Sequence, residues 1–142
     1  MLDGHAANSA AASKLKKIAA TTNVWESMGV DEKLSSNAVE MRKATAKMMT
    51  ENLAEINKHV DATTFPFFML EQCKNIGICG LTIKGYGSAS LSNLDAAGIA
   101  YELAKRDGSF GLFFLAHTNL GMAVINALAD EEQKQRWLPP AI

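Results

Sequence analysis

Two cysteines, Cys73 and Cys79, are the first candidates for chemistry, because a pair of thiols can bind a metal or form a disulfide. They lie six positions apart, with no histidine or further cysteine nearby. A structural zinc site generally needs four ligands, and small disulfide-dependent secreted domains carry more cysteines than these two. The pair is therefore interpreted as two buried thiols in a reducing compartment, and no metal site is expected.

The run Gly85-Tyr86-Gly87 is a second candidate, because glycine-rich loops can hold phosphate groups. A P-loop would continue with Lys and then Ser or Thr, and it would follow a strand. Neither feature is present here. The run is interpreted instead as a tight loop whose glycines take positive φ.

His117 is the third candidate, and it lies within a stretch that has no charged residue. A neutral histidine that is hydrogen-bonded inside a core is more common in such a stretch than a catalytic one. The sequence contains no Gly-x-Ser-x-Gly nucleophile elbow and no Cys or Ser whose spacing from a His reveals a catalytic pair. No complete active site is therefore predicted.

The element expected to come first is an amphipathic helix of about six turns, which lies after Leu34 and extends to Val60. Its candidate caps are Ser35, Ser36 and Asn37. Its expected core face, close to a period of 3.6 residues, carries Met41, Ala44, Met48, Leu53, Ile56 and Val60. Its other face carries charges of both signs, which indicate a solvated surface: Glu40, Arg42, Lys43, Lys47, Glu51, Glu55 and Lys58.

Further helices are predicted from start and stop signals. A cap and proline at 63–66 and a stop at Gly77 bound a short second helix, and residues 78–88 form a loop with three glycines. Ser92 and Asp95 form a variant capping box for a third helix that runs to about Arg106. A last short helix begins at Asp130 with Gln133 and ends at Trp137, because Pro139 and Pro140 prevent its continuation. The predicted fold class is all-α, with about five helices.

The stretch from Phe110 to Ala129 contains no Asp, Glu, Lys or Arg. As a helix it would extend roughly 30 Å, enough to cross the core of a bilayer. It also contains His117, Thr118, Asn119 and Asn126, and it lacks the flanking aromatic residues and the Lys/Arg asymmetry of a membrane span. A fully buried helix in a larger protein is favoured, with a membrane span as the alternative.

Composition sets the remaining limits. With 142 residues, of which 48% are hydrophobic, one ordinary domain is expected. The 14 Lys and Arg residues nearly balance the 15 Asp and Glu residues, which argues against nucleic acid as a partner. Residues 1–30 are rich in Ala, Ser and Thr and are expected to be a disordered leader or extension, with an organellar transit peptide as the alternative. Residues 31–142 form the predicted domain.

Several motifs, in order and in register, resemble the acyl-CoA dehydrogenase and oxidase family. They are Phe65-Pro66-Phe67, Ile76-Gly77-Ile78-Cys79-Gly80, Thr82-Ile83-Lys84-Gly85-Tyr86-Gly87, Glu102-Leu103-Ala104, Asn119-Leu120-Gly121 and Glu132-Gln133-Lys134-Gln135-Arg136-Trp137-Leu138-Pro139. The segment beginning at Thr82 most resembles glutaryl-CoA dehydrogenases and plant peroxisomal short-chain acyl-CoA oxidases. The resemblance covers about residues 31–142.

Family membership would imply a helical N-terminal domain followed by a β domain and a C-terminal four-helix domain. FAD would lie between the last two domains and a neighbouring subunit. The catalytic Glu would belong to the C-terminal domain, so no catalytic residue is expected in this chain. The resemblance further implies an acyl-CoA substrate, a homotetramer or homodimer when complete, and a location in the mitochondrial matrix or the peroxisome.

The resemblance also suggests where the acyl group lies. A related enzyme that uses glutaryl-CoA binds the distal carboxylate through an Arg and Ser residues on the helix that matches Phe110 to Ala129. Matching through Asn119-Leu120 places that Arg at Gly111 and the Ser residues at Leu112 and Leu115, where this sequence has no polar side chain. A monocarboxylic, short-chain acyl-CoA is therefore expected. The predicted substrate-binding residues are Gly111, Leu112, Leu115, Ala116 and Asn119.

Three readings of function stay open from the sequence. The favoured one is the N-terminal domain of an FAD-dependent enzyme, cut off before its β domain. The others are a flavin-free helical binding or structural module and a single-span membrane protein. Whether electrons would pass from the flavin to oxygen or to an electron-transfer flavoprotein is also undecided at this stage.

Overall fold

The computed structural model describes Trp25 and residues 29–142, and the chain divides into two compact units, Met1–Leu34 and Ser35–Ile142. Nearly all of the leader expected over residues 1–30 lies outside the described residues. In the first unit, the described part contains one turn of 3₁₀ helix, η1 (Val30–Lys33).

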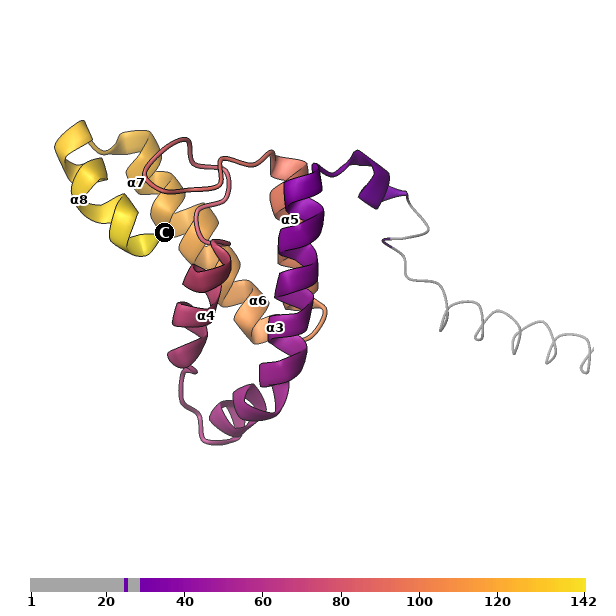
Figure 1. Cartoon of the computed structure of the whole chain (residues 1–142). Coiled ribbons are helices and arrows are strands. Elements are labelled where there is room, and N and C mark those ends of the chain that lie inside the picture. Colours follow the sequence, from indigo (N-terminus) through magenta and orange to yellow (C-terminus); the bar gives the residue numbers. More distant parts are fainter. Residues whose placement is uncertain (1–24, 26–28) are drawn as a thin grey trace, which may run out of the picture. The chain divides into compact units, whose positions relative to one another are not determined.

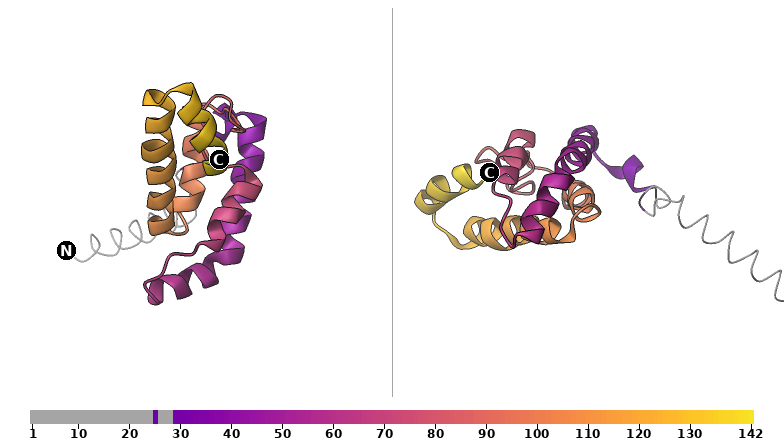
Figure 2. Two further views of the ribbon diagram at one scale, coloured as in Figure 1. Left: turned by 90° about the vertical axis from the view of Figure 1, so that its left-hand side faces the viewer. Right: turned by 90° about the horizontal axis from the view of Figure 1, so that it is seen from below.

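The second unit contains the helices (Figure 1). They are α3 (Ser36–Asp61), α4 (Phe68–Ile76), α5 (Asn93–Ala104), α6 (Gly108–Leu115), η2 (Ala116–Met122), α7 (Ala123–Leu128) and α8 (Glu131–Ala141). No strand occurs among the residues that the structure describes. Since α6, η2 and α7 run on as one helix over 108–128 (Figure 2), the unit has five helices, and the all-α prediction is confirmed.

Helix α3 begins at the predicted cap, where the Ser35 hydroxyl accepts a hydrogen bond from the Ala38 N–H at 3.2 Å. Its predicted core face is right at Met48 and Ile56 but wrong at Val60, which is 54% exposed. The residues of α3 that are buried are Ala38, Thr45, Met48, Met49 and Ile56. The last turn of α3 therefore extends past the elements that cover its middle.

Helix α4 ends as predicted at Gly77, which has the left-handed conformation (φ 76°) that favours glycine. Its start is two to five residues later than predicted. The segment around Pro66 forms turns instead, in which the Phe67 N–H donates to the Phe65 carbonyl at 2.9 Å. The proline thus precedes the helix and is not part of its first turn.

Helix α5 begins at the predicted capping box: the Ser92 hydroxyl accepts from the Asp95 N–H at 3.1 Å, and the Asp95 carboxylate accepts from the Ser92 N–H at 3.3 Å. The helix ends at Ala104, two residues before the predicted end at Arg106. Helices α3 and α5 pack side by side (Figure 1).

The long helix begins at Gly108, where the Asp107 carboxylate caps it by accepting from the Phe110 N–H at 2.6 Å. Its central segment η2 is a π-helix, which the sequence pattern did not predict. The prediction that this helix is fully buried in a larger protein stays a prediction, and in the described residues one side of the helix is open, with Leu112 69% and Leu128 81% exposed. No helix of the described residues covers this side. Helix 108–128 is long and apolar enough to cross a membrane by length and composition, which is weak evidence on its own.

Helix α8 begins with the predicted capping box of Asp130 and Gln133 but does not end at Trp137. It continues through Pro139 and Pro140. The fixed φ of proline is compatible with a helix, and the carbonyls that lose N–H partners belong to exposed residues that water can reach. Figure 2 shows α8 folded back beside α7.

The core of the second unit consists of two clusters. The larger lies among α3, α4, α5 and α6 and is built from Met48, Met49, Ile56, Met69, Cys73, Ile78, Cys79, Leu81, Ile99, Leu103, Phe110 and Phe114. The smaller holds α8 against the loop and η2 and contains Ile83, Met122, Leu138 and Ile142. The buried state predicted for Cys73 and Cys79 is confirmed, and both thiols are free.

Candidate functional site

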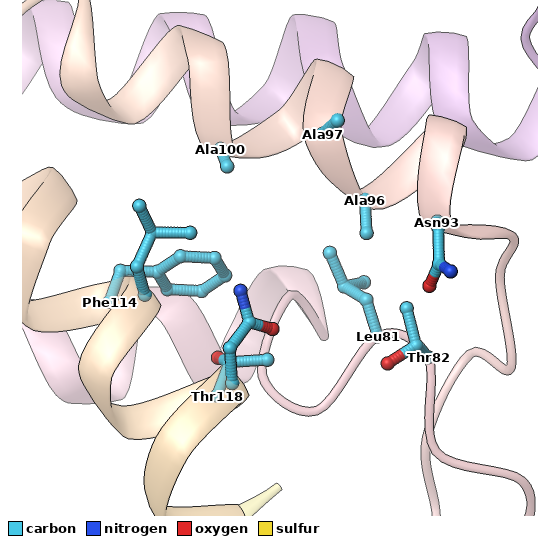
Figure 3. Close-up of a pocket in the computed structure, with 10 residues that line it drawn as sticks. Leu81, Thr82, Asn93, Ala96, Ala97, Ala100, Phe114 and Thr118 are labelled. Atoms are coloured by element: carbon cyan, nitrogen blue, oxygen red, sulfur yellow. The ribbon is translucent and has the colours of Figure 1, made fainter. Parts of the chain in front are cut away.

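A pocket of about 430 Å³ lies between α5 and the facing helix α6–η2, beside the loop that precedes α5. Its lining residues are Leu81, Thr82, Asn93, Ala96, Ala97, Ala100, Phe114, Leu115, Thr118 and Asn119. The side chains of Ala96 and Ala100 point across the pocket toward the facing helix (Figure 3). None of the lining residues is charged, so the pocket suits an uncharged group.

Close packing of α5 against α6 fixes one end of this pocket, and Gly111 allows it. A Cβ at Gly111 would lie 2.7 Å from the Ala104 Cα and 2.8 Å from the Ala104 Cβ, which is closer than atoms can approach. Glycine at this crossing therefore lets two helix backbones come together. Any side chain would push α5 and α6 apart.

Asp95 anchors the start of α5, the helix that forms one side of the pocket. Its carboxylate accepts hydrogen bonds from the Ser35 N–H at 2.8 Å and from the Ser92 hydroxyl at 2.8 Å, which joins the beginning of α3 to that of α5. Burial favours a raised pKa for Asp95, but the hydrogen bonds from Ser35 and Ser92 outweigh it and lower the pKa below its ordinary value. The carboxylate is thus ionised at neutral pH.

The loop before α5 supplies Leu81 and Thr82 to the pocket. The Leu91 N–H donates to the Leu81 carbonyl at 2.6 Å and closes the base of the loop. Gly85 and Gly87 have φ values of 86° and 94°, so the prediction of a tight loop that needs positive φ is confirmed.

The predicted substrate-binding residues do not all share one surface. Leu115 and Asn119 line the pocket. Leu112 is outside it and 69% exposed, and Ala116 also lies outside it. Gly111 is buried at the crossing with α5. The pocket thus brings together two of the five. The π-helical segment begins at Ala116, in the middle of this set, and changes the direction in which the later residues face.

Thr118 is a polar, buried pocket residue that was not among the predicted site residues. Its side chain is 5% exposed, and its hydroxyl oxygen has no hydrogen-bond partner within the described part of the chain. A threonine within an apolar stretch was the available signal, because a helical threonine normally bonds back to its own helix. The sequence could not show that this one does not.

His117 takes part in packing and hydrogen bonding within the unit. Its Nε2 lies 3.2 Å from the Ala141 carbonyl oxygen, and its ring stacks on Phe113 with centroids 5.9 Å apart. This arrangement ties the long helix to the end of α8 and fits the predicted structural histidine. Among the described residues, no three His, Cys, Asp or Glu side chains are grouped to hold a metal ion.

Burial changes the acidity of the two thiols. It raises the pKa of Cys73 to about 12, with a smaller contribution from Cys79, and it also raises the pKa of Cys79. Both side chains are therefore protonated at neutral pH, and neither is an activated nucleophile.

The pocket does not fit a whole FAD molecule. A diphosphate would need cationic side chains or several free backbone N–H groups, and no lysine or arginine lines the pocket. The lining residues fit an uncharged chain or ring. No chemical step that passes through a flavin is therefore assigned to these residues.

Residues 35–142 match the model of one protein family, which is described as acyl-CoA dehydrogenase, N-terminal domain. The mitochondrial isovaleryl-CoA dehydrogenase of Pongo abelii is 29% identical over 113 residues, which cover 77% of this chain and 27% of that protein. The short-chain specific acyl-CoA dehydrogenase of Clostridium acetobutylicum is 30% identical over 102 residues, covering 70% of this chain and 27% of the relative. The chain thus spans about a quarter of the length of these relatives.

The fold also matches solved structures. A glutaryl-CoA dehydrogenase from Mycobacterium smegmatis in complex with FADH2 aligns with a TM-score of 0.71 and 24% identity, covering 78% of this chain and 29% of that one. A second structure of glutaryl-CoA dehydrogenase from the same organism gives a TM-score of 0.72 at 24% identity, covering 82% and 31%. At this identity the similarity establishes the helical fold and leaves the substrate open.

Proposed function

This chain belongs to the acyl-CoA dehydrogenase family, and we propose that it forms the N-terminal helical domain of an FAD-dependent enzyme that introduces the α,β double bond into a short-chain acyl-CoA. The relatives compared above are named dehydrogenases, which supports electron transfer to an acceptor other than oxygen. The role of this domain in that enzyme is to bind and enclose part of the substrate.

The observation that carries the proposal is the uncharged surface of the helix 108–128. The side chains of Leu112 and Leu115 are apolar, and no charged residue lines the adjacent pocket. Such a wall stabilises a hydrocarbon tail by about 0.8 kcal/mol per buried methylene group. A distal carboxylate against the same wall would lose its water without gaining a partner, at a cost of several kcal/mol.

The residues that do the chemistry are proposed to lie elsewhere in the complete enzyme. No acidic side chain lines the pocket, so none of its residues is proposed as the base that removes the α proton. FAD held by other parts of the complete enzyme would supply the oxidising chemistry. The apolar face of helix 108–128, beside the pocket, orients the acyl group and excludes water from it.

Two further features of the complete enzyme are proposed by likeness. Three of the isovaleryl-CoA dehydrogenase relatives are named as mitochondrial, which supports the mitochondrial matrix, and none of these relatives supports the peroxisome. A homotetramer or homodimer is proposed for the complete enzyme, with contributions from a neighbouring subunit to the FAD site.

Substrate competition tests the proposal. In an enzyme that contains this domain, butyryl-CoA should show a higher kcat/KM than glutaryl-CoA. Leu112→Arg with Leu115→Ser should narrow that gap by supplying partners for a carboxylate. Gly111 is unsuitable for such a substitution, because a side chain there would meet Ala104. A higher kcat/KM for glutaryl-CoA in the unsubstituted enzyme would show that the assignment of the wall is wrong.

FAD retention gives a second test. The 142-residue chain, purified with excess FAD, should lose the cofactor on gel filtration, because its pocket has no cationic partner for the diphosphate. A flavin spectrum of one FAD per chain after gel filtration would contradict the proposal that most FAD contacts lie outside this chain.

A further inference from the structure

The hydroxyl of Thr118 is buried in the wall of the pocket without a hydrogen-bond partner. The side chain is 95% buried, and its Oγ1 is the single buried side-chain oxygen or nitrogen in the described part of the chain that lacks one. Removing a hydroxyl from water without a compensating hydrogen bond is unfavourable. The unpaired hydroxyl therefore destabilises the fold, and a hydrogen bond to a bound ligand would offset this cost.

Other helical threonines show the usual solution. Thr45 and Thr50 in α3 donate their hydroxyls to the carbonyls four residues earlier, at 2.8 Å and 2.7 Å. Thr118 makes no such bond. It lies in the π-helical segment Ala116–Met122, where the backbone pairing differs from that of an α-helix. This local geometry keeps the Thr118 hydroxyl available to a group from outside the chain.

The surroundings of Thr118 limit what that group can be. The alanines of α5 and Phe114 supply apolar surface, and the side chains of Asn93 and Asn119 supply amide donors and acceptors at the exposed rim. A diphosphate would find no cation here, and a plain hydrocarbon would leave the Thr118 hydroxyl unpaired. A neutral chain that carries amide groups fits both kinds of surface: its methylene groups can pack on the apolar side chains, and its amides can bond to the hydroxyl and the two asparagines.

We propose that Thr118 is a specificity-determining residue that donates its hydroxyl to an amide carbonyl of the neutral pantetheine arm of an acyl-CoA. This rests on the proposed function, since it assigns a part of that substrate to the pocket. Leu115 and Asn119 border both the pocket and the apolar helix face, so the amide-bearing arm and the acyl tail occupy adjacent surfaces.

Binding of pantetheine to the 142-residue chain tests the assignment without FAD or turnover. Titration followed by NMR should give a dissociation constant that rises about 3–10-fold in Thr118→Val, the size of one lost neutral hydrogen bond. Thr118→Ser keeps the hydroxyl and should stay within about 2-fold of the unsubstituted chain. Equal affinities in the unsubstituted chain and Thr118→Val would overturn the proposal, as would failure of the unsubstituted chain to bind pantetheine.

Thermal unfolding shows whether Thr118→Val is folded and whether the Thr118 hydroxyl destabilises the chain without ligand. Without ligand, Thr118→Val should melt about 3–6 °C higher, because it removes a buried unpaired hydroxyl. A variant that melts lower would show that the hydroxyl already has a partner in the free chain, and the proposal would be wrong.

The two proposals fail separately. If the complete enzyme oxidises acyl-CoA but Thr118→Val leaves pantetheine affinity unchanged, the assignment of Thr118 is wrong and the proposed function stands. If the complete enzyme oxidises no acyl-CoA but pantetheine affinity depends on the Thr118 hydroxyl, the binding site stands and the proposed reaction is wrong.

Discussion

Arg42 on α3 donates two hydrogen bonds to one carboxylate oxygen of Glu102 on α5, from Nε at 3.0 Å and from Nη2 at 2.9 Å. The other oxygen of Glu102 accepts from Arg106 Nη1 at 2.6 Å. The Glu102 side chain is 6% exposed and that of Arg42 12% exposed. A nearly buried carboxylate thus lies between two guanidinium groups and joins helices that are sixty positions apart in the sequence.

Replacing Glu102 with Gln should lower the free energy of unfolding by about 3–5 kcal/mol, since the substitution removes a nearly buried negative charge that two guanidinium groups share. Urea unfolding followed by circular dichroism measures the change. Glu51→Gln is the matched control, because Glu51 forms an ion pair with Lys47 on the exposed side of α3. Loss of this exposed pair should change the free energy of unfolding little. Equal effects of the two substitutions would contradict a structural role for the buried pair.

The sequence assigned Arg42 to a solvated face, and the reason for the error is general. Helical period and residue type predicted the charged face of α3 correctly at Lys43, Lys47 and Glu51, which are exposed. They cannot show that another helix with a carboxylate will pack against one position of that face. Long-range pairing of Arg42 with Glu102 depends on the tertiary fold.

Gly111→Ala should destabilise the chain by about 1–3 kcal/mol, because the new Cβ would lie 2.7 Å from the Ala104 Cα and the helices would have to separate. Gly121→Ala is the matched control on the same long helix. A Cβ there meets its nearest atom, the Ala116 oxygen, at an ordinary 3.8 Å, so Ala should be neutral or stabilising. Thermal unfolding compares the two variants, and a Gly111→Ala variant as stable as Gly121→Ala would refute the close approach.

Sequence reasoning found the helix that carries the candidate site but not the orientation of all its residues. Local signals were sufficient to predict the helices. They are the charge-free stretch, the capping boxes of α5 and α8, and the glycine that ends α4. The placement of Gly111 and Thr118 was not predictable in this way. The position of Gly111 depends on how α5 and α6 cross. The orientation of Thr118 depends on a π-helical segment, which changes the period along the helix.

Asp95→Asn should destabilise the chain by about 1–2 kcal/mol at pH 7, because it weakens the capping box of α5 and the bond from the Ser35 N–H. The pKa of Asp95 is lowered in the folded state, so its ionisation stabilises the fold above the ordinary value of 3.8, and this stabilisation is lost as the pH falls further. Unfolding measured from pH 7 to pH 2 should therefore show the two proteins converging at low pH. A difference that stays constant over this range would contradict the assigned shift.

The Cys73 thiol should resist iodoacetamide at pH 8 in the folded chain and react in urea, because burial keeps it protonated and inaccessible. Since burial raises its pKa from 9.0 to about 12, the folded thiol stays neutral while the unfolded one ionises. Stability should thus fall as the pH rises from about 9 toward 12. Cys73→Ala should lose less stability over that interval than the unsubstituted chain, and an identical pH dependence in both would contradict the shift.

The exposed apolar side of helix 108–128 should make the chain self-associate. Leu112, Leu120 and Leu128 are 69%, 67% and 81% exposed, and several large exposed apolar side chains on one helix are normally covered by another protein element or by lipid. Sedimentation velocity over a hundredfold range of concentration should show the average mass rising with concentration. Replacing all three leucines with Gln should restore a monomer, whereas Val60→Gln with Leu94→Gln should not, because those exposed residues lie on α3 and α5. A concentration-independent monomer of the unsubstituted chain would show that this apolar side is stable in water without a partner.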